Sequence, residues 1–441
     1  MAKRRLGAGS GLRAGFVLAL AGAALSAASP VLAQSSSGGP LDSLTQPLER
    51  VLLLEKPSQP PAFTVPVEPL GFSAPGIFYL GQRNGMVSLD FLDENRLLFT
   101  FRVPGLIRRE AGEENQRQIR ALVLTLPAGT VEAEALWTVH DRARYLWMLN
   151  DGHFLLRDRD NLQLGDAALE LKPYLHFPGP LLSLEMDPSQ QFLLAYSREP
   201  AQEGKKAAEA AGSASAAASD EPGPATQPEL VVRILRRDSG RVLLASRSSA
   251  AVHLPINTEG YLESVRARGD KWLLNLKYFS GGSALLGQVN SISSPGVDFI
   301  SEREMLVTIF PAIGGRELVA MGTGDRPIWE YQTFKAAAWP LLVKSPNGSR
   351  LAWEALVLDP SISTSTFGPE DVKGQLIEVL NAADGKVVLD APASPVLDAG
   401  GNVAISPSGR RVAVLNGGKI QVFELPPAPP LPKIAVSPPD R

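Results

Sequence analysis

The chain of 441 residues contains no cysteine. This absence excludes disulfide bonds, thiolate metal sites, a cysteine nucleophile and lipid attachment at a cysteine. Histidine is also scarce: the four histidines stand at no metal-ligand spacing from one another, and no His-Glu-x-x-His motif occurs. From the sequence we therefore assign no catalytic, cofactor-binding or metal-ligating residue, and no cofactor.

The sequence also lacks an apolar run of ~20 residues, the length that a membrane-spanning helix needs. The longest apolar stretch near the start, Ala14–Leu25, covers 12 residues. It follows a basic segment at Lys3–Arg5 and precedes small residues that end at Ala33, which is the pattern of a secretory signal peptide. We expect residues 1–33 to be removed before Gln34, which leaves a periplasmic or secreted protein without a membrane span. An uncleaved N-terminal anchor is the alternative.

The chain has no excess of basic residues. Its formal net charge is −3 at pH 7, and removal of the four basic residues in the signal peptide would lower it to −7. Nucleic-acid binding needs clustered lysine and arginine, so we do not expect a nucleic-acid partner. We expect a protein or peptide as the partner instead, bound by a monomer.

What the sequence does contain is a short repeated phrase in which a polar turn precedes a β-rich apolar run. The 40 glycines and 37 prolines interrupt the chain too often for long helices. Repetition of a turn and a strand favours a β-propeller, in which each repeat forms one blade. The copies are Asp93–Phe101, Asn150–Leu156, Asp187–Tyr196, Gly269–Leu276, Ser301–Ile309, Ser345–Trp353 and Ser406–Val414.

The spacing of the repeats predicts seven four-stranded blades. If residues 201–228, which are rich in Ala, Ser, Gly and Pro, are set aside as a disordered insert, the span 85–426 divides into seven units of about 45 residues each. The interval between Asp270 and Ser301 is short for a complete blade. Either these two turns lie on different strands of a blade, or one blade is irregular.

The last repeat supplies only three strands, so the ring needs another strand to close it. An unpaired sheet edge invites aggregation. We expect an N-terminal strand, from Gly76–Leu80 or Val87–Phe91, to complete the last blade. The resulting organisation is a signal peptide at 1–33, a flexible linker with one possible short helix at 34–71, an all-β propeller at 72–425 and a Pro-rich tail at 426–441.

Two segments carry a resemblance to a known family. Ser406–Val414 with Lys419–Phe423, and Ser345–Ala352, resemble the Ser-Pro-Asp-Gly element of WD40-like and YVTN-like bacterial β-propellers. The resemblance implies a propeller fold and a protein-interaction scaffold in the cell envelope. Such families also contain enzymes, so fold alone does not decide function.

Three functions are consistent with these features. The first is a non-catalytic exported propeller that binds a protein or peptide through loops on one face. The second is an enzyme (hydrolase, lyase or dehydrogenase) with a site at the central channel, and the third is a tethered structural component of the envelope. The enzyme hypothesis requires at least three of six side chains to meet within about 4–6 Å. These six are His140, His153, Asp158, Asp160, His176 and His253.

Overall fold

The computed structural model describes residues 59–74, 80, 85, 87–103, 116–140, 142–199, 229–248, 253–311, 316–322, 327–333, 337–359, 361 and 367–430, with the backbone alone for 332–333 and 337–340. All of them belong to one compact unit, Glu55–Arg441. The predicted signal peptide at 1–33, the predicted insert at 201–228 and the possible helix before Lys56 lie outside the described residues.

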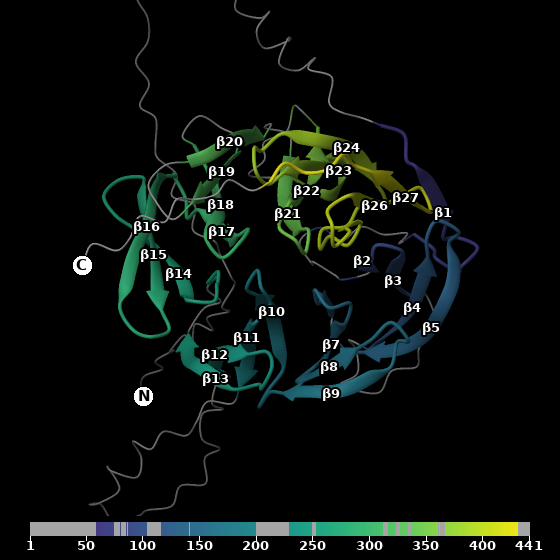
Figure 1. Cartoon of the computed structure of the whole chain (residues 1–441), viewed down its shortest axis with the longest axis horizontal. Helices are drawn as coiled ribbons and strands as arrows, with labels where there is room; N and C mark the ends of the chain where they lie inside the picture. The colour runs from purple at the N-terminus through teal and green to yellow at the C-terminus, as the bar shows by residue number, and fades with distance from the viewer. Residues whose placement is uncertain are drawn as a thin grey trace, which may run out of the picture. The chain divides into compact units, whose positions relative to one another are not determined.

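The described chain is all-β and forms the seven antiparallel sheets of a propeller, as predicted (Figure 1). Blade 1 contains β2 (Val87–Asp93), β3 (Arg96–Arg102), β4 (Arg117–Thr125) and β5 (Thr130–Val139). Blade 2 contains β6 (Leu146–Met148), β7 (Phe154–Asp158), β8 (Asn161–Gly165) and β9 (Leu171–His176). Blade 3 contains β10 (Leu181–Met186), β11 (Phe192–Glu199), β12 (Glu229–Arg236) and β13 (Val242–Ser248).

The remaining blades follow in chain order. Blade 4 contains β14 (Gly260–Arg266), β15 (Lys271–Tyr278) and β16 (Ser283–Asn290). Blade 5 contains β17 (Gly296–Phe299), β18 (Glu304–Ile309), β19 (Arg316–Gly322) and β20 (Pro327–Thr333). Blade 6 contains β21 (Ala337–Lys344), β22 (Arg350–Leu358), β23 (Val372–Asn381) and β24 (Val387–Ala393), with a short 3-10 helix at Pro369–Asp371. Blade 7 contains β25 (Val403–Ile405), β26 (Arg411–Asn416), β27 (Lys419–Glu424) and β1 (Phe63–Pro66).

In two of the repeated turns, a serine side chain accepts a backbone hydrogen bond from the start of the second strand. Ser345 Oγ accepts a hydrogen bond from the backbone N–H of Arg350 (2.9 Å), and Ser406 Oγ accepts one from Arg411 (3.1 Å). Gly348 and Gly409 lie at φ of +69° and +72°, a conformation that glycine adopts without strain. In all seven phrases the polar turn lies between the first and second strands of a blade.

The core of the described residues consists of eight apolar clusters, and seven of them each join two consecutive blades. The cluster between blades 1 and 2, for example, packs Trp137 of β5 against Phe154 of β7 at a ring-centroid distance of 5.5 Å. The cluster between blades 7 and 1 completes the circle. Because each sheet buries both faces against its neighbours, no blade needs a core of its own.

Closure by an N-terminal strand is confirmed, but the predicted segments were wrong. β1 pairs with β27, with Phe63 opposite Val422. Val87–Phe91 belongs instead to β2, the first strand of blade 1, and most of Gly76–Leu80 lies outside the described residues. Five prolines at 57–69 suggested an extended linker rather than a strand. Proline has no backbone N–H to donate to a neighbouring strand. β1 tolerates Pro66 because it is an edge strand, with no further strand beside it that would need this hydrogen bond.

Blade 4 is the irregular blade. Its sheet has three strands in the described residues, whereas the other six sheets have four. The turns at Asp270 and Ser301 occupy equivalent positions in blades 4 and 5, so the short interval between them reflects a missing strand. After Asn290 the chain enters β17 at Gly296, and a link this short has no room for a further strand of the same blade.

Candidate functional site

The six side chains that the enzyme hypothesis required to meet are paired with separate neighbours. The nearest contacts between a histidine nitrogen and a carboxylate oxygen are His140–Asp158 at 2.9 Å, His153–Asp151 at 3.2 Å, His176–Asp160 at 3.9 Å and His253–Glu185 at 3.2 Å. Within the described part of the chain, no three His, Asp or Glu side chains form a group that could hold a metal ion. These six residues therefore give the enzyme hypothesis no support.

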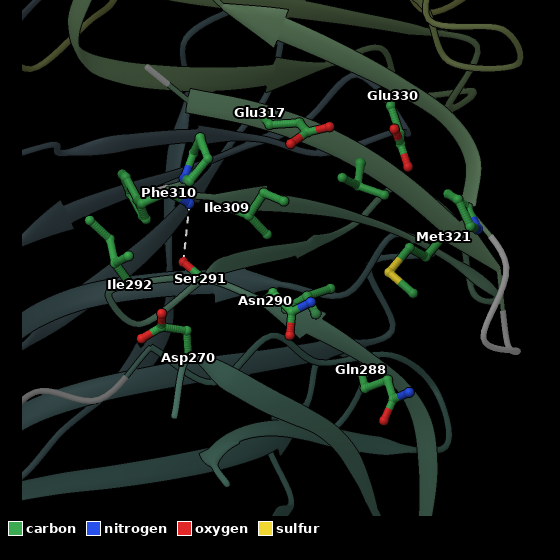
Figure 2. A pocket seen from close by; sticks show the side chains of 14 residues that line it. Asp270, Gln288, Asn290, Ser291, Ile292, Ile309, Phe310, Glu317, Met321 and Glu330 are labelled. Carbon is green, nitrogen blue, oxygen red and sulfur yellow. Dashed lines mark hydrogen bonds between the residues drawn. The ribbon is translucent and has the colours of Figure 1, made fainter. Parts of the chain in front are cut away.

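A groove lies beside the open edge of blade 4, with a cavity volume of about 450 Å³ (Figure 2). In a complete propeller, the fourth strand of this blade would cover the outer part of the face of blade 5. Here the sheet ends at β16 among the described residues. Beyond the apolar contacts between the two blades, Glu317 of β19 and Glu330 of β20 consequently line a groove that no described strand covers.

The two walls of the groove differ in chemistry. Figure 2 shows Glu317 and Glu330 on the blade 5 side, and Gln288 and Asn290 of β16 on the blade 4 side. The floor includes apolar side chains, among them Ile309, Phe310 and Met321. Ser291 fixes the end of the groove, because its hydroxyl accepts a hydrogen bond from the Phe310 backbone N–H (3.0 Å).

The acidic wall is not neutralised by an ion pair in the described residues. Burial, and after it the charge of Glu330, raises the pKa of Glu317 above its ordinary value. Arg316 lies near the groove, but its guanidinium packs over the Phe310 ring at 5.7 Å. Two neighbouring carboxylates of this kind favour a cation, because a positive charge removes their mutual repulsion.

The groove also has exposed apolar neighbours on blade 4. Leu285 of β16 is 54% exposed, and Ile292, which follows β16 and lines the groove, is 50% exposed. Large exposed aliphatic side chains beside an unpaired sheet edge are typical of a surface that another chain covers.

A second cavity, of about 600 Å³, lies at the centre of the ring. Residues at or beside the first strand of every blade line it. Six successive blades contribute charged side chains to the cavity, and the sign alternates from blade to blade; blade 3 contributes Asp187 as well as Glu185. With one residue taken from each blade, the series in blade order is Asp90, Arg144, Glu185, His253, Asp298 and Lys344. We call them the channel ring.

His253 is held as a cation by its two acceptors. Its Nε2 lies 2.7 Å from the carbonyl oxygen of Val297, and its Nδ1 lies 3.2 Å from the Glu185 carboxylate. Since both partners are acceptors, both ring nitrogens carry a proton. Burial alone would lower the pKa of His253, but the hydrogen bond and charge of Glu185 and the charge of Asp298 outweigh it and raise the pKa to about 9.

Burial and opposite charges also shift the pKa values of three other members of the channel ring. Burial raises the pKa of Asp90 to about 6, although Ser88 and Arg144 oppose the shift. Burial likewise raises the pKa of Asp298, against the effects of Lys344 and His253. Burial lowers the pKa of Arg144, whose guanidinium packs over the Trp147 ring at 5.4 Å.

Sequence reasoning found His253 but missed the other five members of the ring. The sequence pattern that could have identified them is a single charged residue in the apolar strand before a polar turn. Asp90 lies between buried Leu89 and Phe91, and Asp298 follows the same pattern. Because the blades follow chain order, such isolated charges come together at the axis although they are about 50 residues apart in the sequence.

Other sequence features have structural partners. Asp158 accepts a hydrogen bond from the backbone N–H of His140 (2.8 Å), and Asp160 accepts one from Asn161 Nδ2 (2.8 Å). Trp137 and Trp329 are buried between blades and pack in the core. No helix in the described residues is long and apolar enough to cross a membrane.

No family model and no curated protein matches the chain. Among solved structures, acylaminoacyl peptidase from Pyrococcus horikoshii is similar, with 9% identity and a TM-score of 0.44 over 78% of this chain and 52% of the peptidase chain. The WD40 domain of Toxoplasma gondii coronin shows 9% identity and a TM-score of 0.44, over 85% and 88% of the two chains. For hydrazine synthase from Kuenenia stuttgartiensis the values are 10% and 0.39, over 80% and 98%.

The chain spans about half the length of the peptidase chain that it matches. Similarities this distant carry no functional argument. The strand topology itself defines the class: seven antiparallel blades around an axis, with the last blade closed by an N-terminal strand. The resemblance to WD40-like propellers is confirmed at the level of the fold.

Proposed function

We propose that the protein is a non-catalytic, exported propeller that binds a partner protein. The partner contributes an extended basic segment, which pairs along β16. The observation that carries the proposal is the open edge of blade 4 beside an acidic groove. An unpaired edge strand presents backbone N–H and C=O groups that an extended peptide can pair with, as in binding by strand addition.

The side chains of the groove set the chemistry of the peptide. Backbone pairing to β16 contributes affinity without regard to sequence, and the pockets for alternate side chains give specificity. A lysine or arginine directed at Glu317 and Glu330 neutralises the acidic wall. An aliphatic neighbour covers Ile292, which is half exposed in the free protein.

The export part of the proposal rests on the signal-peptide pattern of residues 1–33. Intact-mass measurement of the exported protein tests it. We expect Gln34 as the first residue. A mass that includes residues 1–33 would favour the tethered alternative.

Binding is tested with the mature chain, residues 34–441, and labelled peptides of about eight residues in which valine alternates with lysine, glutamine or glutamate. We expect fluorescence anisotropy to show the tightest binding for the lysine peptide, weaker binding for the glutamine peptide and none for the glutamate peptide. A lysine peptide with methylated backbone nitrogens should bind poorly, because it cannot complete the strand pairing. Equal affinity for all four peptides, or none for the lysine peptide, contradicts the proposal.

Two substitutions locate the site. Glu317→Gln and Glu330→Gln should each weaken binding of the lysine peptide by about three- to fivefold, the usual scale for a partly exposed ion pair. Glu132→Gln, an exposed carboxylate on the outer strand of blade 1, is the matched control and should leave affinity unchanged. If all three variants behave alike, the peptide binds elsewhere.

A further inference from the structure

The alternation of charge around the channel ring stops at blade 7. Asp90 and Asp298 each lie opposite the second apolar residue of the next strand, and Ala404 of blade 7 occupies the same register position. Where blades 1 and 5 present a carboxylate, blade 7 therefore presents a methyl group. Ile405 beside it is also apolar, and both residues line the central cavity.

Because of this break, Asp90 and Lys344 each have an oppositely charged neighbour on one side only. β25 of blade 7 contacts both β21 and β2, the strands that carry Lys344 and Asp90. Asp90 interacts with Arg144 on the far side from blade 7, and Lys344 interacts with Asp298 on its own far side. The two residues thus flank an apolar gap with opposite charges facing it.

Both flanking residues keep hydrogen-bonding capacity for a ligand. The Lys344 ammonium has three N–H donors, and among the described residues it uses one, to the Phe299 carbonyl oxygen (2.7 Å). The Asp90 carboxylate accepts one hydrogen bond, from the Ser88 hydroxyl (2.5 Å), and has room for more. The central cavity of about 600 Å³ gives a small molecule access to both groups.

We propose that this gap binds a small molecule carrying one cationic and one anionic group, with its cation at Asp90, its anion at Lys344 and its apolar part against Ala404. A ligand with only one charge would cover the other flanking residue and remove it from water without a partner, which is costly. An amino carboxylate, such as a free amino acid or a short peptide with free ends, satisfies both. The site is separate from the groove at β16, so this proposal does not depend on the proposed function.

Calorimetric titration of the mature chain tests this proposal. The probes are 4-aminobutyrate, 6-aminohexanoate and glycylglycine, and the singly charged controls are hexylamine and hexanoate. At about pH 7.5 the Asp90 carboxyl, with a pKa of about 6, is ionised. We expect at least one amino carboxylate to bind, and the singly charged compounds to bind at least about tenfold more weakly.

Variants on both sides of the gap distinguish specific binding from general charge effects. Asp90→Asn and Lys344→Met should each weaken binding of the amino carboxylate by about tenfold or more, since each removes a charged hydrogen bond. Asp93→Asn, on the same strand as Asp90 but outside the cavity, is the matched control. Circular dichroism establishes that each variant is folded, and the two flanking variants provide independent tests.

Three results would overturn the inference: no heat from any amino carboxylate at about 10 mM, equal binding of the singly charged compounds, or unchanged affinity in both flanking variants. The lysine peptide that tests the groove should not compete with the amino carboxylate. Competition between them would place both ligands in one site and would contradict the assignment of the gap.

Discussion

Blades 7 and 4 begin from the same situation and end differently. Each receives three strands from one continuous stretch of chain. In blade 7, β1 arrives from the N-terminal side and pairs along β27, so the sheet has four strands. In blade 4, no described segment pairs with the outer edge of β16. One edge has been closed within the chain, and the other faces a groove.

The difference follows from what each outer position does for the ring. β1 places Val65 in the cluster that joins blades 7 and 1, and Val67, which follows the end of β1, lies in the same cluster. β1 therefore closes the circle of blades. Blade 4 is joined to blade 5 by the side chains of three strands, among them Leu262, Leu276 and Leu286. Among the described residues no fourth strand occupies that position, which is where we propose that an external strand binds.

The largest effect should come from breaking the closed edge. Val65→Asp places an unpaired charge in the cluster between blades 7 and 1, where Val65 is 2% exposed. We expect a loss of about 3–5 kcal/mol in the free energy of unfolding, measured by urea denaturation.

Thr64→Asp is the control, because Thr64 lies on the opposite, exposed face of the same strand. It should change the free energy of unfolding by less than about 0.5 kcal/mol. Similar losses in the two variants would mean that the contribution of β1 comes from backbone pairing rather than from the cluster beneath it.

The seam between blades 6 and 7 makes a second, pH-dependent contribution. Glu354 of β22 is buried there, and its carboxylate accepts a hydrogen bond from Gln375 Nε2 (2.7 Å). Burial raises its pKa from 4.5 to about 7, although the backbone N–H groups of Gly401 and Asn402 act in the opposite direction. Because the folded pKa is the higher one, the stability that the protonated group contributes is complete below about pH 4.5 and is lost as the pH rises through 7.

Glu354→Gln should remove this dependence. Relative to the variant, the parent chain should lose about 3 kcal/mol of unfolding free energy between pH 4.5 and neutral pH. Urea denaturation of both proteins across that range measures the difference, in which the titration of other groups cancels. If the unfolding free energies of the two proteins change with pH in parallel, Glu354 is not the source of the pH dependence.

The propeller was predictable because every blade repeats one local event. Each polar phrase marks the turn between the first and second strands, and this turn chemistry can be read from a few residues such as Ser345-Pro346-Asn347-Gly348. The closing strand was not predictable from local pattern. β1 has four residues and ends in proline, and it is a strand only because the exposed edge of β27 is there to pair with it.

The sites were less accessible to sequence reasoning than the fold. The short spacing between Asp270 and Ser301 indicated either turns on different strands or one irregular blade, but it did not show that β16 would border a groove. Glu317 and Glu330 come together only through the pairing of β19 with β20. The channel ring depends on the closed circle, since its charges lie on different blades and meet only around the axis.

The smallest effect on stability should come from the open edge, which completes the comparison. Leu285→Asp changes a side chain of β16 that is 54% exposed, so the free energy of unfolding should move by less than about 0.5 kcal/mol, against several for Val65→Asp. A charge on an edge strand opposes pairing with other chains, so the variant should remain monomeric at higher concentration, as measured by light scattering. A large loss of stability would mean that β16 is already covered within the folded chain, and the contrast between blade 4 and blade 7 would then disappear.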